Sequence, residues 1–126
     1  MGRMNPRAKR PDRAELEAQL ARAREQLRLG RLFVANLPRF RRELTALDWY
    51  LPEQISGGLA TVFAEVRPEH YNGRTPPERA IERECLGAEL FPFAWHSSLM
   101  GERMYLKLAV NDSGSVWVVS LHRSSV

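Results

Sequence analysis

The stretch RMYLKLAVNDSGSVWVVSLHR, from Arg103 to Arg123, has the pattern of two β-strands joined by a tight turn. Apolar residues alternate with polar ones on both sides of the turn, as in strands that bury one face. The turn contains Asn111, Asp112 and Gly114, which are residue types that adopt the backbone angles of hairpin turns. The stretch therefore predicts an antiparallel hairpin.

The hydrophobic pattern also predicts how the two strands pair. In the expected register one face carries all the apolar side chains: Met104, Leu106, Leu108, Trp117, Val119 and Leu121. A shift by one residue would mix the two faces, because side chains alternate along a strand. We therefore expect Tyr105 opposite Ser120 and Arg103 opposite His122, both pairs on the other face.

The second face of the predicted sheet collects an unusual set of side chains. The preceding segment AELFPFAWH, residues 88–96, also alternates, and antiparallel pairing puts its histidine beside Arg103. The face then holds His96, Arg103, Tyr105, Lys107, Ser120 and His122. A solvated sheet face would explain a polar row. Two imidazoles, a phenol and two cations without any acid suit the binding of a phosphodiester as well.

The residue types limit the chemistry of such a site. The chain has no metal-ligand spacing, no paired carboxylates on this face, no glycine-rich phosphate loop and no Gly-x-Ser-x-Gly motif. Metal-free RNA cleavage remains, in which the 2′-hydroxyl of the substrate attacks the neighbouring phosphate. We expect Tyr105 and His122 to transfer the protons, and Arg103 and Lys107 to hold the phosphate.

Further residues are candidates for substrate binding. On and next to the predicted strands these are His96, Ser120 and Arg123. Asn72 and Arg74 lie in the turn-rich stretch RPEHYNGRTPPER, residues 67–79, and long polar loops in small domains often carry function. No cofactor is expected.

Length and composition place the chain among small globular proteins. A chain of 126 residues fits one compact domain, and no apolar run is long enough to span a membrane. Cys85 is the single cysteine, so no internal disulfide forms and a reducing cytoplasm is expected. Residues 1–11 are polar, basic and rich in proline, so we expect a disordered basic arm there and a single α+β domain over 12–126.

Helices are predicted in the first two thirds of the chain. Asp12 and Glu15 form a capping-box pattern, and Pro38 and Pro52 stand at plausible first-turn positions of two further helices. A short helix is expected over residues 76–85. The fold class is thus α+β, with two or three N-terminal helices packed on a C-terminal antiparallel sheet of three or more strands.

Charge is distributed unevenly along the chain. Residues 1–42 hold 12 Lys and Arg against 4 Asp and Glu, while residues 43–126 hold 7 against 11. The first third therefore carries +8 and the remainder −4. Such a basic segment attracts nucleic acid or an acidic partner, although a solvated helix face accounts for it equally well.

Two stretches resemble a known family. MYLKLAV…VWVVSLH is similar to the C-terminal hairpin of MqsR-type toxins, a Tyr-Leu-Lys strand followed by a Val-Ser-Phe-Lys strand. LDWYLPEQISGGLATVFAEVRPEHYNG, residues 47–73, resembles the apolar helix and loop of that family. The resemblance covers residues 47–126, and the first 46 residues match more loosely.

The resemblance implies a RelE-like fold and an mRNA-cleaving toxin, neutralised by an antitoxin protein encoded nearby. Tyr105 matches the catalytic tyrosine of the family, and His122 stands where the family has a catalytic lysine. Asn72 or Arg74 falls near another catalytic lysine of the family. The alternative is a non-catalytic module on the same fold, such as a plasmid or phage accessory protein, that binds nucleic acid or protein.

Overall fold

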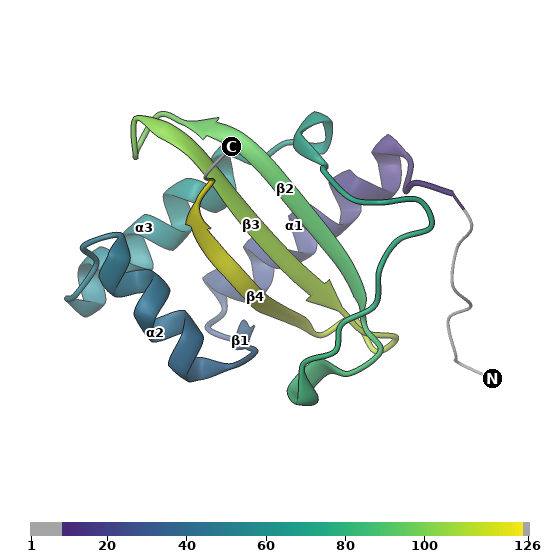
Figure 1. Cartoon of the computed structure of the whole chain (residues 1–126), viewed down its shortest axis with the longest axis horizontal. Coiled ribbons are helices and arrows are strands. Elements are labelled where there is room, and N and C mark those ends of the chain that lie inside the picture. Colours follow the sequence, from purple (N-terminus) through teal and green to yellow (C-terminus); the bar gives the residue numbers. More distant parts are fainter. Residues whose placement is uncertain (1–8, 125–126) are drawn as a thin grey trace.

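The computed structural model describes residues 9–124 and confirms the α+β class (Figure 1). Three α-helices pack on a four-stranded sheet within this part of the chain. The elements are α1 (Arg13–Arg28), β1 (Phe33–Val34), α2 (Leu37–Ala46), α3 (Pro52–Glu65), the 3₁₀ turns η1 (Pro68–His70) and η2 (Arg83–Cys85), β2 (Glu89–Ser97), β3 (Glu102–Val110) and β4 (Val116–Arg123). Most of the expected basic arm, residues 1–8, lies outside the described residues.

The sheet has the strand order β1-β4-β3-β2. Strands β2, β3 and β4 form the predicted antiparallel meander. The short strand β1 pairs with β4 in parallel, which makes the sheet mixed rather than purely antiparallel. The strand β1 has only two residues, which is too short for a periodic pattern, so the sequence did not predict it.

The helices begin where their capping residues predict. The Asp12 side chain accepts a hydrogen bond of 2.8 Å from the Glu15 backbone N–H, and the Glu15 carboxylate accepts one from the Asp12 backbone N–H. Pro38 and Pro52 lie in the first turns of α2 and α3, where a missing N–H costs little. None of the helices in the described part of the chain has the length and apolar character needed to cross a bilayer.

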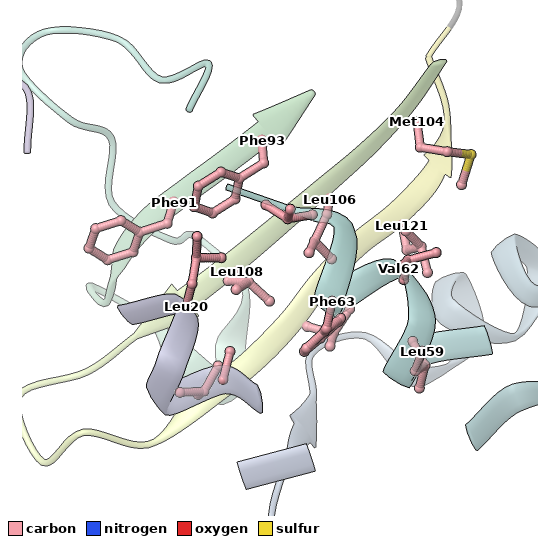
Figure 2. Close-up of a cluster of buried hydrophobic side chains, with 14 of the residues drawn as sticks. Leu20, Leu59, Val62, Phe63, Phe91, Phe93, Met104, Leu106, Leu108 and Leu121 are labelled. Carbon is pink, nitrogen blue, oxygen red and sulfur yellow. The ribbon is translucent and has the colours of Figure 1, made fainter. Parts of the chain in front are cut away.

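The main core lies between the sheet and the helices α1 and α3 (Figures 1 and 2). Figure 2 shows its contributors from both layers, including Leu20, Leu59, Val62, Phe63, Phe91, Phe93, Leu106 and Leu108. In β3 burial alternates from Met104 to Leu108, as the sequence predicted. In β2 the predicted residues Phe91, Phe93 and Trp95 do contribute to this core, but the strand is buried on both faces except at His96. The opposite face of these strands is therefore turned away from α1 and α3.

The segment between η1 and β2 is not the predicted helix. Within residues 76–85 the structure contains only the single turn Arg83–Cys85. The backbone of this segment pairs instead with the outer edge of β2, where Glu78 O accepts from Leu90 N–H and Arg79 bridges Glu89. Two adjacent prolines, Pro76 and Pro77, also disfavour helix propagation.

The predicted register of the hairpin was wrong. Next to the turn, Leu108 pairs with Val118 rather than with Trp117, and a β-bulge in β4 then shifts the pairing by one further residue. Tyr105 therefore pairs with His122, and Lys107 pairs with Ser120. The bulge places one extra residue, Val119, between the partners of Lys107 and Leu108. Trp117 and Val119 consequently leave the predicted apolar face and pack with Ala35, Ala80, Cys85, Ala88, Leu90 and Ala109 in a second cluster. The predicted pairing of His96 with Arg103 is confirmed.

Candidate functional site

The sheet face that is turned away from α1 and α3 carries most of the predicted site residues. We call this surface the open face; its members are His96 of β2, Arg103, Tyr105 and Lys107 of β3, and Ser120 and His122 of β4. His96 and Arg103 are exposed, Ser120 is buried, and the other three are half-buried. Neighbouring strands in antiparallel pairing bring these side chains together.

Tyr105 and His122 form the centre of the open face. Their rings stack with 5.2 Å between centroids and 29° between planes. His122 Nδ1 lies 2.8 Å from the Arg123 carbonyl oxygen. A carbonyl oxygen only accepts, so Nδ1 carries the proton of this bond, and in the neutral ring Nε2 keeps the lone pair.

The environment of Tyr105 keeps its hydroxyl protonated. Burial raises the pKa of Tyr105 above its ordinary value, and the negative charge of Glu78 adds to the effect. Glu78 belongs to the segment that pairs with the edge of β2. At neutral pH the phenol is therefore a proton donor rather than a base.

The structure brings an acid to the open face that the strands themselves lack. Ser120, the partner of Lys107, donates a hydrogen bond of 2.6 Å from Oγ to Oε2 of Glu43 on α2. The sequence pattern of the strands indicates neither Glu43 nor Glu78. No local signal relates either carboxylate to a strand so far away in the sequence.

Three predicted substrate-binding residues are not among the strand residues of the open face. Asn72 is at the outer edge of β2, where its backbone N–H bonds Pro92 O at 2.8 Å. Arg74 is exposed and lies 3.9 Å from Glu78. Arg123 pairs with Glu102 and with the carbonyl of Ala46 at the end of α2. Since Arg123 follows His122 directly, strand alternation points it to the opposite side of the sheet.

Two other kinds of site find no support among residues 9–124. No group of three His, Cys, Asp or Glu side chains in this range could hold a metal ion. Burial, together with the charges of Glu82 and Glu84, raises the pKa of the Cys85 thiol to about 11. This thiol stays protonated at neutral pH and is therefore not an activated nucleophile.

Comparisons with known proteins give no assignment. No family model matches the chain, and neither the curated proteins nor the solved structures contain a significant match. The similarity to MqsR-type toxins therefore stays a prediction from the quoted motifs.

Proposed function

We propose that the open face binds single-stranded RNA and cleaves it without a metal ion, through attack of the 2′-hydroxyl on the adjacent phosphate. The observation that carries this proposal is the contact between Tyr105 and His122. A proton donor and a potential proton acceptor lie side by side, and the cations of Arg103 and Lys107 lie on either side of Tyr105 along β3.

The geometry favours one division of roles. His122 Nε2 is the base that removes the proton from the 2′-hydroxyl, because its lone pair is free when Nδ1 bonds Arg123 O. Tyr105 donates a proton to the departing 5′-oxygen, in keeping with its raised pKa. Lys107 and Arg103 stabilise the additional negative charge on the phosphate. The bond between the 2′-oxygen and phosphorus forms while the bond between phosphorus and the 5′-oxygen breaks. The products are a 2′,3′-cyclic phosphate and a free 5′-hydroxyl.

The family resemblance extends the proposal to the biological setting. It adds a cytoplasmic toxin that acts on mRNA and a neutralising antitoxin protein encoded nearby. A free cysteine, Cys85, is compatible with a reducing compartment. An antitoxin that blocks the activity directly would cover the open face.

One observation favours a second candidate, a non-catalytic RNA-binding module. Stacked aromatic rings beside cations are a common platform for unpaired bases. Tyr105 and His122 offer such a platform whether or not protons move. Binding without cleavage would be the result expected of this module.

Cleavage of a fluorescently labelled single-stranded RNA tests the proposal. His122→Ala should reduce the cleavage rate by roughly 10²–10⁴-fold, the usual effect of losing a general base. Tyr105→Phe should also slow cleavage, whereas Tyr50→Phe, at an exposed tyrosine between α2 and α3, is the matched control and should be silent.

Further arms of the same experiment separate the candidates. His122→Lys should retain some activity, and a chelator should leave cleavage unchanged. Chelator-sensitive cleavage, or full activity in His122→Ala, would exclude the proposed mechanism. RNA that is bound but never cut would establish the binding module instead.

A further inference from the structure

The bulge in β4 decides which side chains reach the open face. If the pairing of Leu108 with Val118 continued without an extra residue, Tyr105 would oppose Leu121 and Leu106 would oppose Ser120. Ser120 and His122 would then point into the core, because a one-residue shift exchanges the two faces of a strand. The bulge places both polar side chains on the open face and Leu121 in the core.

At and beyond the bulge, backbone groups of β4 have no strand partner on the side where β1 lies. β1 pairs with β4 at Trp117 and Val118, and the last backbone bond in this direction joins Ala35 N–H to Val118 O at 3.0 Å. Beyond that point the neighbour of β4 is helix α2 (Figure 1). The Val119 carbonyl and the Leu121 N–H need other partners there.

Two side chains of α2 supply these partners. Arg39 donates from Nη2 to Val119 O at 2.6 Å, and Glu43 Oε1 accepts from Leu121 N–H at 3.1 Å. Their spacing of four residues puts both side chains on the same side of the helix. We call Arg39 and Glu43 the β4 clamp.

Each residue of the clamp also bonds a second side chain. The second carboxylate oxygen of Glu43 accepts the bond from Ser120 Oγ, so one side chain binds both the backbone and a side chain of the bulge. Arg39 lies 3.1 Å from Glu82, whose side chain is only 15% exposed. These bonds are charge-assisted and partly buried, which makes them stronger than ordinary surface contacts.

We infer that Arg39 and Glu43 are positioning residues for the open face, because they hold the bulge that places His122 against Tyr105. The inference rests on the proposed function for its catalytic consequence. Its geometric consequence does not depend on RNA. The clamp does not touch the reacting groups; it acts through Val119, Ser120 and Leu121.

The test is made on the whole chain by nuclear magnetic resonance and by RNA cleavage. In Glu43→Ala the Leu121 amide should exchange with solvent about 10–100-fold faster, as expected when a hydrogen bond to a charged group is lost. The contact between the rings of Tyr105 and His122 should weaken, and the cleavage rate should fall with little change in RNA affinity. Arg42→Ala, an exposed position on the same helix, is the matched control.

Two further variants keep the test decisive. Arg39→Met removes the other half of the clamp and should disturb the same ring contact. This variant tests the inference independently if Glu43→Ala does not fold. Glu43→Gln keeps an acceptor for Leu121 N–H and should restore much of the amide protection. Unchanged Leu121 protection and an intact ring contact in both Glu43→Ala and Arg39→Met would overturn the inference, even if wild-type protein cleaves RNA. A lost ring contact in a protein that never cleaves RNA would support the inference and remove the proposed function.

Discussion

Glu65 shows how one side chain can connect two layers of the fold. Its carboxylate accepts hydrogen bonds of 2.9 Å from Trp95 Nε1 and from Leu99 N–H. Burial acts to raise the pKa of Glu65, but these and neighbouring hydrogen bonds outweigh it, so the pKa is lowered in the folded protein. Glu65 therefore ties the end of α3 to the turn between β2 and β3.

This arrangement predicts a pH-dependent contribution to stability. A carboxyl group whose pKa is lower in the folded state contributes fully above its unfolded value of 4.5, and its contribution is lost as the pH falls through the folded value. Thermal unfolding should show wild-type protein more stable than Glu65→Gln at pH 7, with the difference shrinking below about pH 4.5. Glu53→Gln, at an exposed position on the same helix, is the control. An equal difference at pH 7 and pH 3 would contradict the linkage.

At the scale of elements, helix α3 contains two adjacent glycines that look unfavourable in sequence. The structure separates their roles. Nothing lies within 4 Å of a Cβ placed on Gly57, whereas a Cβ on Gly58 would lie 2.6 Å from ring atoms of Trp49. Trp49 is buried, so Gly58 is the position at which α3 lets an aromatic ring approach its backbone.

The two glycines make a matched pair for mutation. Gly57→Ala should stabilise the protein by up to about 1 kcal/mol, because alanine is the better helix former. Gly58→Ala should destabilise it by about 1–3 kcal/mol despite the same gain in propensity, since the buried indole must move. Denaturant unfolding measures both free energies. Equal effects of the two substitutions would show that the approach of Trp49 does not limit α3.

Over the whole molecule, charge is the property most relevant to the proposed ligand. The basic excess lies in residues 1–42, yet the open face carries cations of its own in Arg103 and Lys107. Several basic side chains of the first third, among them Arg24, Arg28 and Arg39, form hydrogen bonds to other groups of the fold. Arg24, for example, donates to the carbonyls of Phe63 and Val66 at the end of α3. The total charge therefore does not locate the binding surface.

The salt dependence of RNA binding can locate it. Affinity for single-stranded RNA should fall as salt rises, because bound counterions are released from the phosphates. Lys107→Ala should reduce the slope of log affinity against log salt by about 1. Lys9→Ala, the other lysine of the chain, is exposed and outside the open face, so it should leave the slope nearly unchanged. The reverse result would place the RNA on the basic N-terminal segment.

Local sequence determined the helix starts and the residues of the three long strands. Asp12, Pro38 and Pro52 act on the turn that follows them, and alternation in β2 and β3 depends on neighbours two residues away, so both signals can be read without the fold. The same alternation placed Arg103, Tyr105 and Lys107 together on one face. These features involve residues close together in the chain.

The tertiary structure decided the bulge, the strand β1 and the approach of α2. Alternation in β4 predicted that Trp117, Val119 and Leu121 share a face, but Val119 is an extra residue whose carbonyl is bonded by Arg39, 80 positions earlier in the chain. Such a partner leaves no periodic trace around Val119. The pairing of Tyr105 with His122, on which the proposed function depends, is therefore a consequence of contacts between distant segments rather than of the hairpin sequence alone.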